Sequence, residues 1–197
     1  MQRERLLAAM LRATNELTYR EVSVQEVLER AGVSRPTFYE HFENKEDCFL
    51  AAFDSAAARL RRRLASAAQD GEGWRERLRA ALAELLRFVA EDPDAAMSLI
   101  VDARAACPAA LHRRDELLDG FAACLDAEVR AEADADAPPS AIAAAGIVGG
   151  IEALLYSRLY RGGTDDFESL LPSLMYFAVL PYGGHEAASE ELAAPVG

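Results

Sequence analysis

One stretch of the sequence, from Val22 to Lys45, constrains the fold more than any other because it predicts two short helices joined by a tight turn. Ser23 can cap the first helix, and Glu26 follows three residues later, where its carboxylate can reach back to the backbone of the cap. Apolar residues then recur at helical spacing as far as Gly32, a residue that readily takes the left-handed backbone found at helix ends. Ser34 can cap the second helix directly afterwards. This order of caps and glycine is typical of a helix-turn-helix.

The second of these helices has an inner and an outer face. Phe38 and Phe42 are four residues apart and form the inner face, so the remaining side chains of the helix point outward. A helix with hydrogen-bond donors on its outer face can enter the major groove of DNA, and we interpret this one as a recognition helix. Lys45 begins a further helix, at a position that favours a phosphate group. The residues predicted to contact DNA are Ser23, Gln25, Ser34, Arg35, Pro36, Thr37, Tyr39, His41 and Lys45.

Residues 31–46, which read A-G-V-S-R-P-T-F-Y-E-H-F-E-N-K-E, resemble the DNA-binding signature of the tetracycline-repressor (TetR) family of bacterial regulators. The resemblance implies an all-helical dimer with a three-helix DNA-binding head, a linking fourth helix and a larger helical body that senses a small molecule. It also implies that Arg35, Pro36 and Thr37 contact bases. The residues that it implies mostly hold the DNA backbone are Tyr39, His41 and Lys45.

Two residues draw attention within this signature and just before it. Thr18 stands where a family member usually has glycine, and threonine tolerates a positive φ poorly, so we expect the first helix to end differently here. Glu40 is an acidic residue on the DNA-facing side of the recognition helix. A glutamate at this position can accept a hydrogen bond from cytosine or point to solvent, and we favour solvent.

The net charge of the chain argues against a DNA partner and is the weakest point of this interpretation. The 197 residues carry a net charge of −12, whereas nucleic-acid-binding domains are usually basic. Residues 1–50 hold seven Lys/Arg and nine Asp/Glu, so most of the negative charge lies beyond them. We expect modest non-specific affinity, supported by dimerisation and by a few arginines of the first helix: Arg3, Arg5 and Arg12. The acidic head leaves open another class, a helical ligand-binding or protein-interaction module without strong DNA binding.

The rest of the chain predicts helices throughout and no strands, so the predicted fold class is all-α. We predict a three-helix head in residues 1–60, with the helix-turn-helix at about 23–42, and a helical ligand-binding and dimerisation body in residues 61–197. The expected breaks and caps in the body are a linker at 69–73, a cap at Asp92, an acidic and mobile loop at 133–140 and a cap at Thr164.

The last two predicted helices carry apolar faces interrupted by glycines. Two such faces exceed what one small body needs to bury, so we predict a homodimer formed through them. Gly146 and Gly150 have the spacing of a membrane dimer motif, but Glu152 and Arg158 follow closely, which favours soluble helices. The predicted interface residues are Ile147, Ile151, Leu155, Leu170, Leu174 and Phe177.

A largely apolar small-molecule effector is predicted to bind among the helices between residues 74 and 132, because their apolar faces are long. Aromatic and methionine side chains at helical spacing also fill ordinary cores, and that alternative stays open. We expect the effector to loosen DNA binding through the fourth helix, which joins head and body. The candidate ligand-binding residues are Trp74, Phe88, Met97, His112 and Phe121.

Nothing in the sequence supports catalysis, a cofactor or a metal site. Three histidines lie far apart, and three cysteines lack paired spacing, so we expect a non-enzymatic protein with reduced thiols. No apolar run approaches the length of a membrane span, and we predict a cytoplasmic protein without a membrane partner. The predicted function is a ligand-responsive transcriptional repressor whose partners are a palindromic double-stranded DNA operator, a second copy of the chain and the effector.

Overall fold

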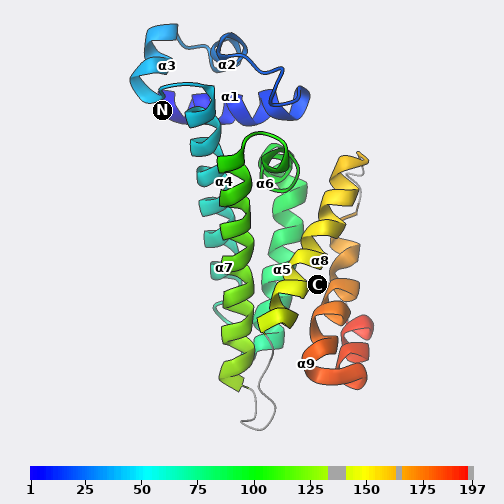
Figure 1. Ribbon diagram of the computed structural model, residues 1–197. Coiled ribbons are helices and arrows are strands. Elements are labelled where there is room, and N and C mark those ends of the chain that lie inside the picture. The colour runs from blue at the N-terminus through cyan, green and yellow to red at the C-terminus, as the bar shows by residue number, and fades with distance from the viewer. Residues whose placement is uncertain (133–140, 163–165, 195–197) are drawn as a thin grey trace. The chain divides into compact units, whose positions relative to one another are not determined.

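The computed structural model describes residues 1–132, 141–162 and 166–194. Within these residues every regular element is a helix, which confirms the predicted all-α fold class (Figure 1). The predicted loop at 133–140 and the predicted cap Thr164 lie outside the described residues.

The chain forms two compact units, and each is made of two segments. One unit contains Met1–Arg59 and Asp92–Asp115, and the other contains Leu60–Glu91 and Glu116–Gly197. The chain first passes from one unit to the other between Arg59 and Leu60, and the predicted domain boundary was at residue 60. Residues 92–115, in contrast, pack with the head instead of the body.

The first unit contains the helix-turn-helix and the helices that support it. Its elements are α1 (Gln2–Glu16), α2 (Val24–Ala31), α3 (Arg35–His41), the first part of α4 (Lys45–Ala67), α6 (Pro93–Ile100), the 3-10 helix η1 (Asp102–Arg104) and the start of α7 (Pro108–Glu132). Helix α1 packs against α2, α3 and α6. Leu6 and Met10 of α1, Val27 of α2 and Phe49 of α4 are fully buried in the core. Each such side chain contributes about 1.5–3 kcal/mol to stability by leaving water. This core therefore supports the helix-turn-helix from the inside.

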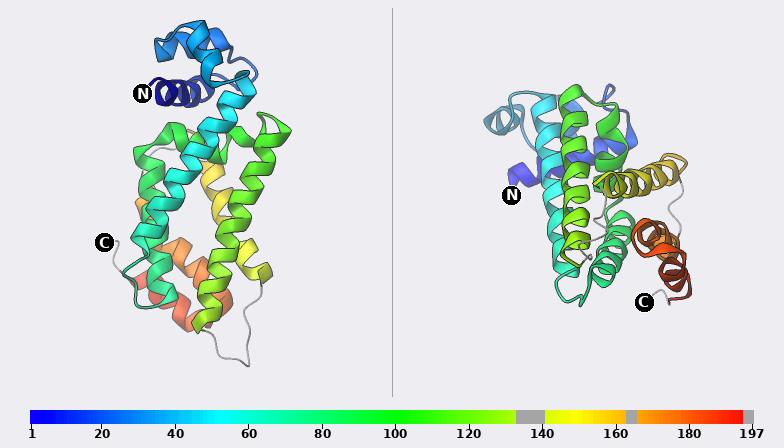
Figure 2. Two further views of the ribbon diagram at one scale, coloured as in Figure 1. Left: turned by 90° about the vertical axis from the view of Figure 1, so that its left-hand side faces the viewer. Right: turned by 60° about the horizontal axis from the view of Figure 1, so that its bottom comes forward.

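The second unit contains the end of α4, the rest of α7 and four further elements. These are α5 (Trp74–Glu91), α8 (Ala141–Tyr160), the 3-10 helix η2 (Glu168–Leu170) and α9 (Leu171–Ala193). Helix α9 packs on α5 and α8, and the two views of Figure 2 show α8 and α9 side by side. The fully or almost fully buried side chains of this unit include Leu86 and Phe88 of α5, Leu155 of α8 and Met175 of α9.

The last helix begins later than the predicted cap would place it. Asp166 has a positive φ of 56°, and its carboxylate accepts a hydrogen bond from the backbone N–H of Ser169 at 3.2 Å. The chain therefore turns through η2 before α9 starts at Leu171. Within α9, Gly184 has a φ of 72° and interrupts the helix, because a left-handed residue breaks the regular backbone.

Helix α8 corrects the expectation that no apolar run approaches a membrane span. Residues Ile142–Tyr160 number 19 and have a mean hydropathy of 1.4, which suffices by length and composition. The core helix of a soluble protein has the same properties, so this finding is weak evidence for a membrane. Ile147, Ile151 and Leu155 of α8 are buried within the unit, and α8 packs on α9. One face of α8 therefore packs within the unit, although only 33% of this stretch is buried.

Candidate nucleic-acid interface

The first helix of the helix-turn-helix begins and ends at the predicted signals. The Ser23 hydroxyl accepts a hydrogen bond from the backbone N–H of Glu26 at 3.3 Å, and the Glu26 carboxylate accepts one from the Ser23 backbone at 2.6 Å. The second bond lowers the pKa of Glu26. At the other end of α2, Gly32 has a left-handed backbone with φ of 62°, and its N–H donates to the Leu28 carbonyl. These bonds satisfy backbone groups that a helix otherwise leaves unpaired.

Helix α3 presents its first turn to solvent. The Ser34 hydroxyl accepts a hydrogen bond from the backbone N–H of Thr37 at 3.3 Å and lies 2.9 Å from the Thr37 hydroxyl. Phe38 and Phe42 are buried as predicted, although α3 already ends at His41 and Phe42 has an extended backbone. The helix is therefore fixed at its start and from its inner face. The exposed side chains of α3 are Arg35, Pro36, Tyr39, Glu40 and His41.

Two of the side chains predicted to contact DNA touch each other across the turn. The Arg35 guanidinium donates from Nη2 to Oε1 of Gln25 at 3.2 Å, and Nε2 of Gln25 donates to Oε1 of Glu29 at 2.9 Å. All three side chains are exposed. The DNA-binding pattern does not single out Glu29, although its spacing of four residues from Gln25 on one helix is a usable signal.

Lys45 has a structural role that its position at a helix start does not predict. Its ammonium donates to the backbone carbonyls of Tyr19 and Val22, each at 2.9 Å, and lies 4.3 Å from the centre of the Tyr19 ring. The same ring meets Phe49 edge-on at 5.1 Å. Two of the three N–H groups of Lys45 are thus used to hold the connection between α1 and α2, and one N–H remains for a phosphate.

Two arginines of α1 are also engaged within the head. The Arg5 guanidinium donates to the carbonyl of Gly32 at 3.2 Å, so it covers the end of α2. The guanidinium of Arg3 lies 5.5 Å from the centre of the Phe42 ring. These contacts leave both positive charges in place but restrict the positions that the two guanidinium groups can reach, because each is held against the head.

Thr18, which stands at the position where we expected glycine, follows the end of α1 without a left-handed backbone. The helix stops at Glu16 and Leu17 has an extended backbone, so Thr18 needs no positive φ. Instead, Thr18 donates from its backbone N–H and from its hydroxyl to the Glu21 carboxylate, at 2.9 and 2.7 Å. These bonds lower the pKa of Glu21 and fix the turn that leads to α2.

Buried polar side chains lie on α6 and η1, which belong to the same unit as α1. Oδ2 of Asp102 and Oγ of Ser98 are shielded from solvent and have no hydrogen-bond partner among the described residues. Burial raises the pKa of Asp102 to about 7, against a smaller lowering effect of the Thr14 hydroxyl of α1. One contact between α1 and α6 is exposed: the Asn15 side chain donates a hydrogen bond to the Asp94 carboxylate at 2.7 Å. This unit therefore contains a carboxyl group that changes its charge near neutral pH.

The five predicted ligand-binding residues are divided between the two compact units. Met97 and His112 belong to the unit that contains the head, whereas Trp74, Phe88 and Phe121 belong to the other unit. Phe88 is buried as a core residue, in agreement with the alternative that aromatic side chains at helical spacing fill the core. His112 is exposed on α7. These residues remain predictions as effector contacts.

Trp74 lines a cavity of about 500 Å³ in the second unit. Its ring meets Tyr182 edge-on at 5.7 Å. The cavity wall also contains Arg75 and Arg79, and both pair with the Glu191 carboxylate. Further glutamates line the cavity: Glu72, Glu76, Glu132 and Glu190. The wall is therefore charged, unlike the apolar site that we predicted for the effector.

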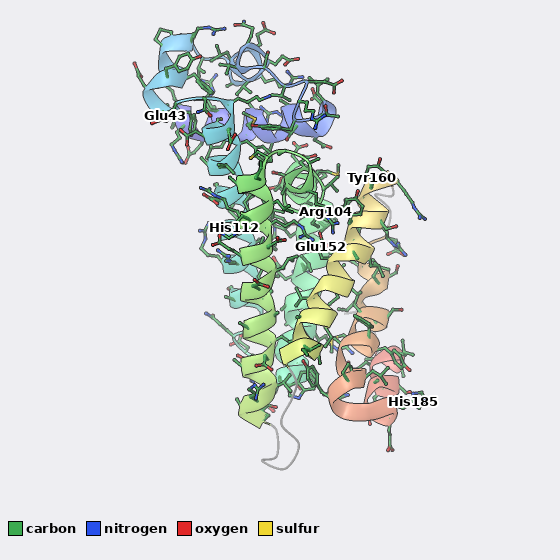
Figure 3. All side chains as sticks on the ribbon, viewed as in Figure 1. Glu43, Arg104, His112, Glu152, Tyr160 and His185 are labelled. Carbon is green, nitrogen blue, oxygen red and sulfur yellow. The ribbon has the colours of Figure 1, made fainter. Side chains whose placement is uncertain are left out.

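Most of the predicted interface residues are buried inside a single chain. The five buried ones are Ile147, Ile151, Leu155, Leu170 and Leu174. Phe177 is 43% exposed, and its ring lies over α8, because a Cβ built on Gly150 would meet it at 2.9 Å. The large apolar side chains that α8 and α9 do expose are Ile142, Leu154, Tyr160, Phe177, Leu180 and Leu192 (Tyr160 is labelled in Figure 3).

The histidines and cysteines do not converge. Figure 3 labels His112 on α7 and His185 on α9, which belong to different compact units. Among the described residues, no group of three or more His, Cys, Asp or Glu side chains is arranged to hold a metal ion. Burial raises the pKa of the Cys48 thiol to about 12, so this thiol stays protonated at neutral pH.

Comparison with known proteins agrees with this geometry. The family described as bacterial regulatory proteins, tetR family, matches residues 6–52, which extend from α1 into α4. The HTH-type transcriptional activator FasR of Mycolicibacterium smegmatis is 31% identical over 91 residues, which are 46% of this chain and 42% of FasR. The chain thus matches less than half the length of this curated relative.

Solved structures share the fold over nearly the whole chain. The transcriptional regulator FadR of Bacillus subtilis, in complex with stearoyl-CoA, has a TM-score of 0.78 at 20% identity and covers 92% of this chain and 98% of its own. A transcriptional regulator of Rhodococcus sp. Rha1 has a TM-score of 0.77 at 24% identity, with 93% and 97% covered. At these identities the likeness concerns the fold.

A pair of short helices with capped starts, an exposed face on the second of them and a helical second unit have the arrangement of a helix-turn-helix protein. The match of residues 6–52 is more specific than this class. Residues 6–52 therefore belong to the tetR family of bacterial regulatory proteins.

Proposed function

We propose that the protein is a homodimeric, ligand-responsive repressor that binds a palindromic operator through α3 and is released by a small-molecule effector. One observation carries the proposal: Arg35, Pro36 and Thr37 stand on a first turn that Ser34 caps and Phe38 anchors. A guanidinium can donate two hydrogen bonds to guanine, and threonine can contact several bases through its hydroxyl or methyl group. A turn held in this way is suited to read base edges in the major groove.

The proposal includes a dimer because a single recognition helix contacts only a few base pairs. We place its interface on the exposed apolar side chains of α8 and α9, with Leu154, Phe177 and Leu180 at its centre. A Cβ built on Gly146 or Gly149 would meet no atom within 4 Å, so the backbone of α8 is open to close approach by a partner helix. The buried residues of the predicted interface support this face from inside the unit.

The proposed effector is hydrophobic or weakly polar, and fatty acyl compounds are the first class to test. One similar structure, that of Bacillus subtilis FadR, is a complex with stearoyl-CoA. Helix α4 runs from Lys45 in the first unit to Ala67 in the second, so it offers a continuous path between an effector and the head. A coupling free energy of about 1–3 kcal/mol is enough to shift operator occupancy substantially.

The effector is tested by thermal-shift measurements with acyl-CoAs and free fatty acids of several chain lengths, followed by operator release. Compounds that stabilise the protein should also weaken its affinity for the operator. Stabilisation that never changes DNA affinity would contradict the coupling. A reporter gene placed behind the operator then decides between repression and activation, a distinction that matters because FasR is named an activator.

DNA binding is tested by selection from random double-stranded DNA at about 50 and 200 mM salt, a range in which phosphate contacts change affinity strongly. A symmetrical enriched sequence with a steep salt dependence supports the repressor. The second candidate function is a ligand-binding or protein-interaction module without strong DNA binding. The acidic head favours this candidate, and the absence of any enriched sequence would support it.

A further inference from the structure

We infer that Gln25 is a positioning residue that presets the Arg35 guanidinium for base recognition, and that Glu29 fixes the orientation of the Gln25 amide. The inference rests on the proposed function, because it assigns roles within the same DNA-reading surface. Its basis is a chain of two hydrogen bonds, from Arg35 to Gln25 at 3.2 Å and from Gln25 to Glu29 at 2.9 Å. We call these three side chains the relay.

The chemistry of the relay allows one orientation of the amide. A guanidinium can only donate, so the group that faces Arg35 must be the carbonyl oxygen Oε1 of Gln25. A carboxylate at neutral pH can only accept, so the group that faces Glu29 must be the amide nitrogen Nε2. The observed bonds satisfy both requirements. Glu29 therefore holds Gln25 with an acceptor directed at Arg35, although the two ends of an amide are otherwise nearly interchangeable.

The relay connects the two helices of the helix-turn-helix across the short turn that joins them. Gln25 and Glu29 stand one turn apart on α2, and Arg35 stands at the first position of α3. Both ends of α2 and the start of α3 are fixed by caps, so the backbone atoms that carry the relay are fixed as well. A side chain as long as arginine otherwise samples many rotamers on an exposed turn.

The bond to Gln25 leaves Arg35 able to read a base. A guanidinium has five N–H donors in a planar fork, and Gln25 uses one of them. Two donors suffice for a bidentate contact to O6 and N7 of guanine. Presetting the fork lowers the conformational entropy that DNA binding must remove, an effect of about 2- to 10-fold in affinity for one long side chain. This gain exists only where Arg35 meets its matching base, so the relay acts on specificity.

The test uses the full-length protein and the operator obtained by selection. Each base pair of the operator is changed in turn, and the loss of affinity at each position is measured for wild type, Arg35→Ala, Gln25→Met and the double variant. Gln25→Met keeps the length of the side chain and removes the acceptor. Glu29→Leu removes the other end of the relay, and Glu29→Asp is the matched control because its carboxylate keeps the charge and can only accept from Gln25. Thermal unfolding confirms that these exposed substitutions leave the fold intact.

The relay predicts a position-specific and non-additive result. Gln25→Met should reduce the preference at the base pair that Arg35→Ala identifies by about 2- to 10-fold and leave the other positions unchanged. Glu29→Leu should act in the same direction, and Glu29→Asp should match wild type in preference. In the Arg35→Ala background, Gln25→Met should have no further effect.

Two results would overturn the relay while the proposed function stands. Equal effects of Gln25→Met with and without Arg35 would show that Gln25 contacts DNA itself, and no effect on base preference would show that Gln25 does not position Arg35. If wild type selects no operator, the proposed function fails first, and the relay fails with it.

Discussion

Replacing Asp102 with asparagine should make the first unit less sensitive to pH. Burial raises the pKa of this carboxyl from its ordinary value of 3.8 to about 7, and its Oδ2 atom has no hydrogen-bond partner among the described residues. The folded protein therefore holds a proton that the unfolded chain releases above pH 4. When a group is protonated in the folded state and ionised in the unfolded state, the free energy of unfolding of the protein falls as pH rises, until the pH passes the pKa of the folded state.

The size of the effect follows from the two pKa values. The full shift corresponds to about 4 kcal/mol between low and high pH, at about 1.4 kcal/mol for each pH unit. Between pH 5.5 and pH 8 the unfolded carboxyl is already ionised, so the folded pKa alone decides the change. In this window the free energy of unfolding should fall by about 2 kcal/mol because of Asp102. The neutral amide of Asp102→Asn cannot ionise, so this contribution disappears.

Urea unfolding of wild type and Asp102→Asn at several pH values between 5.5 and 8 measures the difference. Contributions from all other groups are common to both proteins and cancel. The variant should be more stable than wild type at pH 8, with a difference that shrinks by about 2 kcal/mol toward pH 5.5. Asp119→Asn, at an exposed position of α7, is the control and should show no such trend. A constant difference between wild type and Asp102→Asn would refute the buried-carboxyl argument.

Three further predictions concern single contacts. Lys45→Met removes two hydrogen bonds to backbone carbonyls, so thermal unfolding should show that the free energy of unfolding falls by about 1.5–3 kcal/mol. The slope of DNA affinity against salt concentration should change by less than the one unit expected for a full phosphate contact. Phe177→Glu should give monomers of unchanged helical ellipticity in sedimentation, whereas Ile151→Glu, at a buried position, should unfold the protein; a dimeric Phe177→Glu places the interface elsewhere. Ser34→Ala should cost about 1 kcal/mol of stability, and an unchanged urea midpoint would show that the cap is dispensable.

Local signals made most of the head predictable. Ser23 with Glu26, Gly32 and Ser34 act on backbone groups within four residues of themselves, so the sequence alone indicates where α2 begins and ends and where α3 begins. Thr18 acts over a similarly short range, because it bonds to Glu21 three residues later, although the sequence does not reveal that bond.

Contacts between distant residues were outside the reach of sequence patterns. Lys45 reaches carbonyls more than twenty residues away, and no local rule reveals that its ammonium is engaged. Periodicity shows that α8 and α9 have apolar faces, but it cannot show whether the same chain or a partner covers them. Ile151 is covered by its own unit, whereas Phe177 remains exposed. The packing of residues 92–115 with the head likewise depends on long-range contacts such as that between Asn15 and Asp94.

The central claim is that the first turn of α3 reads DNA bases, and Arg35→Ala tests it most directly. Equilibrium binding is measured on the selected operator and on random DNA of the same length. The account predicts a loss of about 1–3 kcal/mol on the operator and little change on random DNA, because a base contact exists only at the matching sequence. Equal losses on both DNAs would show that Arg35 contacts the phosphate backbone, and the base-reading role of α3 would be contradicted.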